Sequence, residues 1–232
     1  MKAIILAAGK GTRLQELTRG KPKSLLKIRN TTLLNELVDQ LQNSHIDEII
    51  VVVGYKADQI KKAVPKAKFI FNKDFDKGNN ILSVWAAREE ILGHDCLILY
   101  ADLILDQTIL EDCVKINTSC LAVSQQPVLE HTERVITDGN HLIKDIGPHL
   151  TIESANGNFI GVAKLVAEDT YDFISSIKSL LHEKNAYFTR AIKKMIETGH
   201  KIHIVNVNKR FWAEIDLPED YEKVVSNEYL GL

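Results

Sequence analysis

Residues 3–14 read Ala3-Ile4-Ile5-Leu6-Ala7-Ala8-Gly9-Lys10-Gly11-Thr12-Arg13-Leu14, an apolar run followed at once by a glycine-rich, basic loop. A short, uninterrupted apolar run is typical of a buried strand. Glycine permits positive φ angles and lets backbone N–H groups approach a phosphate, and Lys10 and Arg13 add positive charge. The pattern predicts a phosphate-binding loop at the carboxyl end of a first strand. A tight turn with solvated basic side chains is the alternative.

The alternation of apolar run, turn and amphipathic segment continues through the first half of the chain. Ile49–Val53 is apolar without alternation, which is typical of a parallel strand covered on both faces. Thr32–Gln42 places five apolar side chains on one helical stripe, and Asn80–Leu92, with Asn79 or Asn80 as its N-cap, is a second expected helix. Alternating strands and helices predict an α/β fold with a doubly wound, mostly parallel sheet.

The second half of the chain is less regular. Short strands are expected around turns, and helices are expected between them and at the end: strands at Leu121–Gln125, Glu133–Thr137, His141–Ile146, Phe159–Leu165, Lys201–Val207 and Phe211–Ile215, and helices near Asp169–Leu181, Tyr187–Thr198 and from Pro218. No linker, repeat or low-complexity tract divides the sequence. We therefore expect a single domain over residues 1–232 with a small antiparallel insertion.

Composition excludes several classes of protein. Hydrophobic residues make up 45% of the 232 residues, which fits a packed globular chain. The balance of 29 Lys and Arg against 31 Asp and Glu gives a net charge of −2, so no general attraction for nucleic acid or membranes is expected. The three cysteines have no metal-binding spacing, and no apolar run approaches the length of a membrane span. These features predict a cytoplasmic protein with reduced thiols.

Two familiar phosphate-binding motifs do not fit the loop. A dinucleotide fingerprint needs a glycine where Leu14 stands, which argues against a dehydrogenase. A Walker A loop needs a glycine five residues before Gly20-Lys21, where Gln15 stands. The loop therefore handles phosphate in some other way.

Two motifs in sequence order resemble the signature of the nucleotidyltransferase superfamily, which activates phosphorylated small molecules with a nucleoside triphosphate. They are Leu6–Leu14 and Pro22-Lys23. The resemblance extends to Val53-Gly54-Tyr55, Ala101-Asp102 and Trp212-Ala213-Glu214-Ile215-Asp216. It implies a Rossmann-like, GT-A-like nucleotidyltransferase fold, with the nucleotide in residues 1–120, the acceptor in about 121–210, and a metal-site strand and helix in 211–232.

The turn Gly78-Asn79-Asn80-Ile81-Leu82-Ser83 is similar to that of choline-phosphate and 2-aminoethylphosphonate-type cytidylyltransferases. This resemblance implies CTP as the donor and a small phosphorylated or phosphonate acceptor. A sugar-1-phosphate nucleotidylyltransferase that uses UTP or dTTP is the first alternative. A nucleotide-binding protein without catalysis is the second, and a homodimer is compatible with each.

The resemblance also implies roles for individual residues. Arg13 and Lys23 are the expected catalytic cations, and Asp102, Glu214 and Asp216 the expected ligands of Mg²⁺, a hard ion that prefers carboxylates. Asp102 and Asp216 serve as turn or helix caps in the alternative interpretation. The expected nucleotide-binding residues are Leu6, Ala7, Ala8, Gly9, Lys10, Gly11, Thr12, Gly54, Tyr55, Asn79, Asn80 and Ser83.

The acceptor site is the least defined part of this prediction. Glu153, Asn158 and Gly161 flank a strand that resembles the acceptor side of the family. Aromatic side chains are a second possibility, because they bind quaternary ammonium groups by cation–π contact: Trp85, Tyr100, Phe159, Phe211 and Trp212. Ordinary core packing explains the same aromatic residues equally well.

Overall fold

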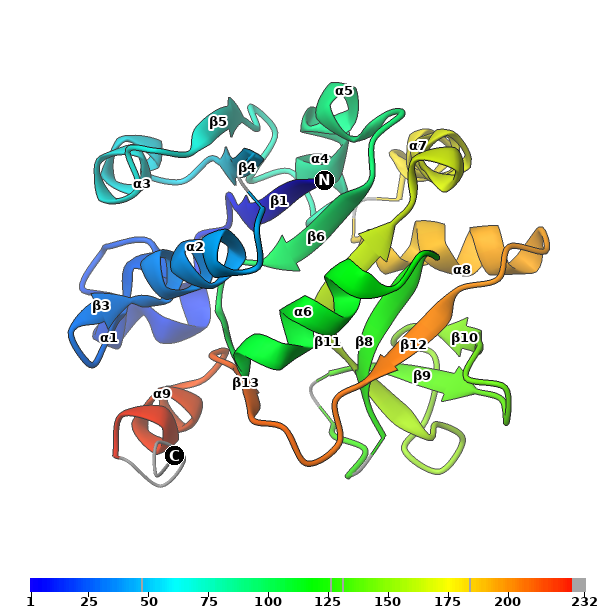
Figure 1. Ribbon diagram of the computed structural model, residues 1–232. Helices are drawn as coiled ribbons and strands as arrows, with labels where there is room; N and C mark the ends of the chain where they lie inside the picture. The colour runs from blue at the N-terminus through cyan, green and yellow to red at the C-terminus, as the bar shows by residue number, and fades with distance from the viewer. Residues whose placement is uncertain (47, 126, 131, 184, 227–232) are drawn as a thin grey trace.

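The computed structural model describes residues 1–46, 48–125, 127–130, 132–183 and 185–226. A nine-stranded sheet forms its centre, with the strand order β10-β9-β11-β6-β1-β4-β5 and with β8 between β11 and β12. Helices cover both of its faces, α2 and α6 on the side nearest the viewer in Figure 1. The expected α/β fold with a doubly wound, mostly parallel sheet is confirmed.

The parallel part of the sheet comes from the first half of the chain. The strands β1 (Lys2–Ala7), β4 (Glu48–Val53), β5 (Lys68–Phe71) and β6 (Cys96–Tyr100) run in one direction. Side chains alternate across a strand, so Ile4 packs in the core on one face while Ala3 and Ile5 pack in the core on the other. Both faces of β1 and β4 are buried, which explains why their sequences lack polar alternation.

Helices surround this sheet. Those of the first half are α1 (Gln15–Thr18), α2 (Leu33–Asn43), α3 (Ala57–Ala63), α4 (Ile81–Ala86), α5 (Arg88–Ile91) and α6 (Gln107–Lys115), and those of the second are α7 (Thr170–Leu180), α8 (Thr189–Glu197) and α9 (Pro218–Val225). Thr32 caps α2, since its side chain accepts a hydrogen bond from the backbone of Asn35.

The helix expected over Asn80–Leu92 is instead two short helices. The break falls at Ala87, whose φ of −90° and ψ of 3° leave the helical region and end α4. The side chain of Asn80 makes no capping hydrogen bond. It accepts one from the backbone N–H of Phe188 at 2.8 Å instead, which ties α4 to the start of α8. A tertiary contact therefore replaces the cap that the sequence suggested.

The second half of the chain adds the antiparallel strands β9 (Glu133–Thr137), β10 (Ile143–Ile146) and β11 (Gly157–Leu165), and the parallel pair β8 (Cys120–Ser124) and β12 (His203–Asn206). β11 pairs antiparallel with β6 and so joins this part to the parallel strands. The register of β11 against β8 shifts between Phe159 and Ala163. Gly161 lies in this irregular stretch with a φ of +86°, a conformation that favours glycine.

Two small sheets complete the fold. One pairs β2 (Lys27–Ile28) with β3 (Thr31–Thr32), and the other pairs β7 (Leu103–Leu105) with β13 (Trp212–Glu214). The β7–β13 pair places Glu214 opposite Leu103, and the backbone N–H of Ile215 donates to the carbonyl of Asp102 at 3.0 Å. The end of the chain is thereby brought to the carboxyl end of β6. None of the helices described is long and apolar enough to cross a membrane.

Candidate active site

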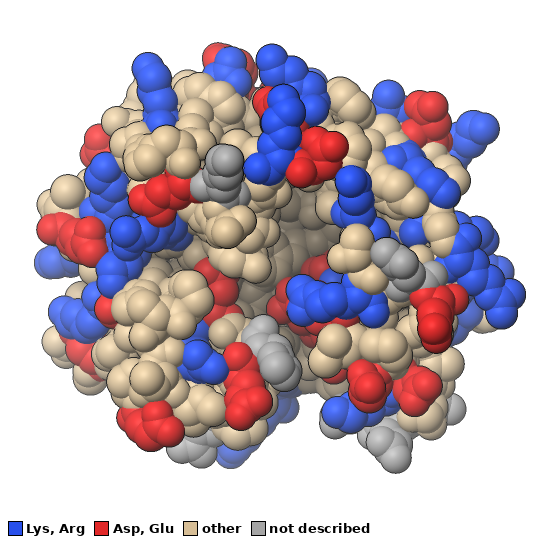
Figure 2. Space-filling model, turned by 180° about the vertical axis from the view of Figure 1, so that it is seen from behind, with Lys and Arg blue, Asp and Glu red and all other residues tan. Residues whose placement is uncertain are grey.

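A cleft of about 570 Å³ opens at the carboxyl ends of β1 and β6. Its size lies within the range of small-molecule sites, and ligands bind α/β sheets at this edge. On the face drawn in Figure 2 the surface is hollowed near its centre, with acidic and basic side chains around the hollow. Most of the residues expected to bind nucleotide or metal line the cleft: Leu6, Ala7, Ala8, Gly9, Gly11, Thr12, Arg13, Lys23, Asn79, Asn80, Ser83, Asp102, Glu214 and Asp216.

The glycine loop and Pro22-Lys23 are in contact, because the backbone of Gly11 lies close to the side chain of Lys23. Gly11 has a φ of +60°, and a Cβ atom built on it would lie 2.7 Å from Cβ of Lys23. Only glycine leaves this space for Lys23, whose side chain is therefore held against the loop. Lys23 begins a 3-10 turn, Lys23–Leu25, directly after Pro22, so its backbone is fixed on both sides.

Lys23 lies between two carboxylates. Its Nζ is 2.7 Å from Oδ2 of Asp102 and 2.5 Å from Oδ1 of Asp216. Burial would lower the pKa of Lys23, but the two carboxylates outweigh it and raise that pKa above its usual value. Arg13 reaches the same group from the solvent side, with Nη1 3.2 Å from Oδ2 of Asp216. The lysine is therefore a permanent positive charge in the centre of the cleft.

Three carboxylates converge in the arrangement that a hard divalent ion prefers. One oxygen atom each of Asp102, Glu214 and Asp216 lies within 4.8 Å of the others. Oδ1 of Asp102 is buried and accepts no hydrogen bond from the part of the chain that the structure describes. Burial, together with the charges of Asp102 and Asp216, raises the pKa of Glu214 well above its usual value. A cation would relieve this repulsion and take up the free oxygen, so these residues fit Mg²⁺.

Asn79, Asn80 and Ser83 line the cleft, and each also has a structural partner. Ser83 is buried and accepts a hydrogen bond from Asn72 Nδ2 at 3.1 Å. Asn79 donates from Nδ2 to the carbonyl of Asn185 at 3.2 Å. Asn80, as described above, accepts from Phe188. The turn therefore joins β5 and α4 to the segment before α8.

Three residues of the expected nucleotide set lie outside the cleft lining. Gly54 is covered by Phe75, whose Cβ would be 2.5 Å from a Cβ built on that glycine. The backbone N–H of Tyr55 donates to the carbonyl of Ala8 at 3.0 Å. This hydrogen bond fixes the backbone just before the glycine loop. The Nζ of Lys10 lies 5.9 Å from the ring centre of Phe75. Phe75 itself lines the cleft, so Gly54 contributes by making room for it.

The three residues expected on the acceptor side also lie outside the lining. Glu153 is exposed in a turn. Asn158 is fully buried, and its amide holds the chain after β8 by donating to the carbonyls of Ser124 and Pro127. Gly161 stands behind Tyr100, because a Cβ on this glycine would lie 2.9 Å from Cδ2 of that ring. Asn158 and Gly161 thus support the wall of the cleft from within the protein.

The cleft has a second end, lined by residues outside the expected nucleotide and metal sets. Tyr100, Glu133, Phe159 and Tyr187 line it, together with Glu130, Thr132, Arg134 and Pro148. Tyr100 and Phe159 had been considered only as possible members of an aromatic cage. Glu133 was missed, although its parity on the strand is a usable signal: it shares a face of β9 with the buried Val135 and Thr137.

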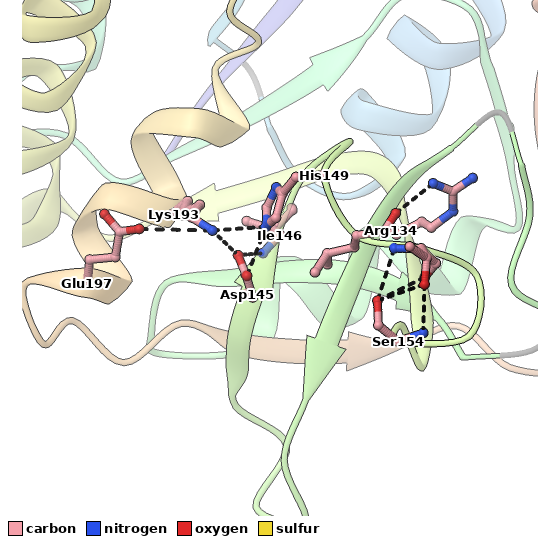
Figure 3. A network of polar contacts seen from close by, with 9 residues as sticks. Arg134, Asp145, Ile146, His149, Ser154, Lys193 and Glu197 are labelled. Carbon is pink, nitrogen blue, oxygen red and sulfur yellow. Dashed lines mark hydrogen bonds and ion pairs between the residues drawn. The ribbon is translucent and has the colours of Figure 1, made fainter.

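Polar contacts fix the loop that closes this end (Figure 3). His149 Nε2 lies 2.9 Å from Oδ2 of Asp145, and Lys193 Nζ lies 2.7 Å from Oδ1 of the same carboxylate. On the other side, Arg134 donates from Nη1 to the carbonyl of Leu150 at 2.8 Å. The loop that carries Pro148 is held between these contacts, so this wall of the cleft is preformed.

Comparison with known proteins agrees with the fold. Residues 3–135 match the family model of the MobA-like NTP transferase domain. The CTP:phosphoglutamine cytidylyltransferase of Campylobacter jejuni is 25% identical, over 96% of this chain and 98% of its own. The 2-aminoethylphosphonate cytidylyltransferase of Lancefieldella rimae is 33% identical over 44% of this chain and 43% of its own. A solved structure of the CTP:phosphocholine cytidylyltransferase of Streptococcus pneumoniae superposes with a TM-score of 0.84 at 24% identity, over 97% of each chain.

The fold and the cleft define an enzyme of the nucleotidyltransferase class. The chain belongs to the family of the MobA-like NTP transferase domain, whose model matches more than half of its length. The resemblance seen in the glycine loop and Pro22-Lys23 is therefore confirmed, as is the expectation of an enzyme.

Proposed function

We propose that this enzyme transfers a cytidylyl group from CTP to a small phosphorylated or phosphonate acceptor in a Mg²⁺-dependent reaction that releases pyrophosphate. The observation that carries the proposal is the position of Lys23, which lies against Gly11 of the phosphate loop and within 2.7 Å of Asp102. One partly buried cation thus borders both the expected triphosphate site and the expected metal site. The names of the relatives support CTP as the donor and a phospho-acceptor as the second substrate.

The chemistry asks for charge neutralisation rather than for a base. An acceptor phosphate oxygen, already ionised, attacks the α-phosphorus of CTP in line with the leaving group. A new oxygen–phosphorus bond forms, the bond from the α-phosphorus to the bridging oxygen breaks, and pyrophosphate carries the electron pair away. No proton transfer is needed, so the cleft must only align two anions and compensate their charge.

The residues of the chain divide this task. Backbone N–H groups of the Gly9–Thr12 loop bind the triphosphate, and the exposed guanidinium of Arg13 balances charge on the departing pyrophosphate. Lys23 balances the charge that develops on the α-phosphate and orients the acceptor oxygen. Asp102, Glu214 and Asp216 would hold Mg²⁺, which would supply Lewis-acid polarisation of the phosphate oxygens.

The base of the nucleotide is placed against Leu6–Ala8, Asn79, Asn80 and Ser83. The compartment proposed is the cytoplasm, which fits three buried free cysteines: Cys96, Cys113 and Cys120. A homodimer is also proposed, and light scattering of the purified chain measures it.

The proposal is tested by pyrophosphate release with Mg²⁺ present. CTP, UTP, dTTP and ATP are each combined with phosphocholine, 2-aminoethylphosphonate, phosphorylated amino-acid derivatives and glucose-1-phosphate. Turnover with CTP and a non-sugar acceptor is expected. Turnover with UTP or dTTP and glucose-1-phosphate instead would favour the sugar-1-phosphate alternative. Nucleotide binding without pyrophosphate release in every combination would favour a non-catalytic protein.

A further inference from the structure

A partly buried carboxylate lies at the second end of the cleft, without a cationic partner among the described residues. Glu133 lines the cleft, and its Oε2 accepts a hydrogen bond from the hydroxyl of Tyr100 at 2.7 Å. Its Oε1 accepts one from the hydroxyl of Thr189, a buried residue at the start of α8. Strands β6 and β9 and helix α8 therefore each contribute to the position of one side chain.

The charge of Glu133 is not balanced within the described part of the protein. Burial raises the pKa of this carboxyl group, and the hydrogen bonds from Thr189 and Tyr100 offset part of that rise. Neither hydroxyl carries charge, and no Lys, Arg or His among the described residues pairs with Glu133. The neighbouring Arg134 instead donates to the carbonyls of Leu150 and Glu130. Burial of an unpaired carboxylate is costly, so a site built this way suits a cationic ligand.

Aromatic rings form the wall beside Glu133. Tyr100 packs edge to face against Phe159 and Phe188, with ring centres 5.9 Å apart in both pairs. Tyr100 and Phe159 face the cleft. Aromatic rings attract ammonium groups, and the effect is strongest where water is excluded. The carboxylate and the rings thus select the same kind of ligand.

Glu133 lines the same cleft as Asp102 and Lys23. Tyr100, whose hydroxyl donates to Glu133, precedes Asp102 by two residues in the sequence. An acceptor with its phosphate or phosphonate at Asp102 and Lys23 can therefore extend within one cleft to Glu133.

We propose that Glu133 binds an ammonium group on the acceptor and so selects phospho- or phosphono-amines over acceptors without a cation. This inference rests on the proposed function, because it names the acceptor class for the same cleft. A carboxylate has about four acceptor positions, of which the two hydroxyls occupy two. The others are free for an ammonium. Sugar hydroxyls would leave the negative charge of Glu133 uncompensated, so the site favours a cation over a sugar.

The test compares acceptors that differ only in charge. Steady-state pyrophosphate release with CTP is measured for 2-aminoethylphosphonate and propylphosphonate, and for phosphocholine and 3,3-dimethylbutyl phosphate. For at least one pair, wild-type kcat/KM is expected to favour the ammonium compound about 30-fold or more, which is the range of a desolvated charge pair. Glu133→Gln reduces this preference to about threefold or less, mainly through the KM of the acceptor, with the KM of CTP unchanged.

Two further variants separate this role from a loss of folding. Glu133→Asp keeps the charge and is expected to retain part of the preference. Glu168→Gln removes an exposed acid that does not line the cleft and is expected to match wild type. Equal kcat/KM for both members of each pair in the wild type, or an unchanged preference in Glu133→Gln, would overturn the proposal.

Direct binding distinguishes this inference from the proposed function. Calorimetry with Mg²⁺ and the α,β-methylene analogue of CTP measures the affinities for 2-aminoethylphosphonate and propylphosphonate without turnover. Tighter binding of the amine that is lost in Glu133→Gln supports the role of Glu133, even if no pyrophosphate were released in any assay. Equal affinity for the two compounds overturns it, even if cytidylyl transfer were observed.

Discussion

The ammonium of Lys23 lies 2.5 Å from the carboxylate of Asp216, although 193 residues separate the two in the sequence. Asp216 follows β13, which pairs with β7 directly after Asp102. The short β7–β13 sheet therefore brings the last strand of the chain to the loop after the first. The charged centre of the cleft exists only when both ends of the domain are folded together.

Removal of the Asp102 carboxylate charge should abolish transfer without unfolding the protein. Its Oδ1 accepts no hydrogen bond from the described residues, so an amide fits in the same space. We expect Asp102→Asn to lower kcat about 100-fold or more, because one ligand of the metal ion is weakened. Pyrophosphate release and a thermal melt measure this, with the exposed Asp39→Asn as a matched control. A folded Asp102→Asn variant with near-normal turnover would remove Asp102 from the site.

Lys23 should compete with a metal ion for Asp102 and Asp216. Its ammonium lies 2.7 Å from Oδ2 of Asp102 and 2.5 Å from Oδ1 of Asp216. We expect Lys23→Met to bind Mn²⁺ about tenfold more tightly in the absence of nucleotide, because a positive charge beside the ligands has been removed. The same variant should lose transfer activity by about 100-fold or more. Calorimetric titration with Mn²⁺ measures the first effect, and unchanged Mn²⁺ affinity would show that lysine and metal occupy separate places.

A methyl group at Gly11 should disturb catalysis through Lys23. The added Cβ would meet Cβ of Lys23 at 2.7 Å, an atom close to the backbone that cannot swing aside. We expect Gly11→Ala to lower kcat/KM by on the order of 10- to 100-fold, because the lysine is displaced. Gly199→Ala is the control, since Gly199 has a φ of +100° with nothing within 4 Å of its Cβ position. That control should cost about 1 kcal/mol of stability and leave kcat/KM unchanged. Equal losses of kcat/KM in Gly11→Ala and Gly199→Ala would show that backbone strain, and not displacement of Lys23, causes the loss.

The preference for an ammonium acceptor should depend on pH through Glu133. Burial raises the pKa of this carboxyl above its usual value, with the Thr189 and Tyr100 hydroxyls opposing the rise. Only the ionised form attracts an ammonium. As pH falls through the raised pKa, Glu133 is protonated and the ratio of kcat/KM for 2-aminoethylphosphonate to that for propylphosphonate should fall.

This ratio isolates Glu133, because titration of the phosphonate and of other groups such as Glu214 affects both acceptors. In Glu133→Gln the ratio should be low and independent of pH. A wild-type ratio that is constant between about pH 5 and 8 would show that Glu133 does not set the preference.

The sequence allowed the parallel half of the fold to be predicted, because its signals are local. Ile49–Val53 has the uniform apolar character of a strand buried on both faces, and Thr32–Gln42 carries its apolar side chains on one helical stripe. The glycine loop and Lys23 could also be predicted as site residues, because the two motifs that contain them follow the first strand in sequence order. Their contact was not predictable, because it depends on the left-handed backbone of Gly11 and the fold of the turn after it.

The acceptor end of the cleft could not be predicted, because its residues come from separate parts of the chain. Tyr100, Glu133 and Thr189 meet only after β9 and α8 pack against the end of β6. Asn158 and Gly161, expected on the acceptor side, support the wall of the cleft and do not line it. The alternation of side chains along β9 indicates that Glu133 points to the same side as the buried Val135 and Thr137. It does not indicate which side chains of other elements Glu133 meets there.

The account is tested most directly by ³¹P NMR of a mixture of the enzyme, Mg²⁺, CTP and 2-aminoethylphosphonate. It predicts equal amounts of pyrophosphate and of a cytidylyl anhydride of the acceptor, because the acceptor oxygen attacks the α-phosphorus. Formation of CDP and inorganic phosphate, or of CMP without an acceptor adduct, would contradict attack at that phosphorus by the acceptor. An unchanged spectrum with this acceptor and with phosphocholine would contradict cytidylyl transfer to the proposed class of acceptors.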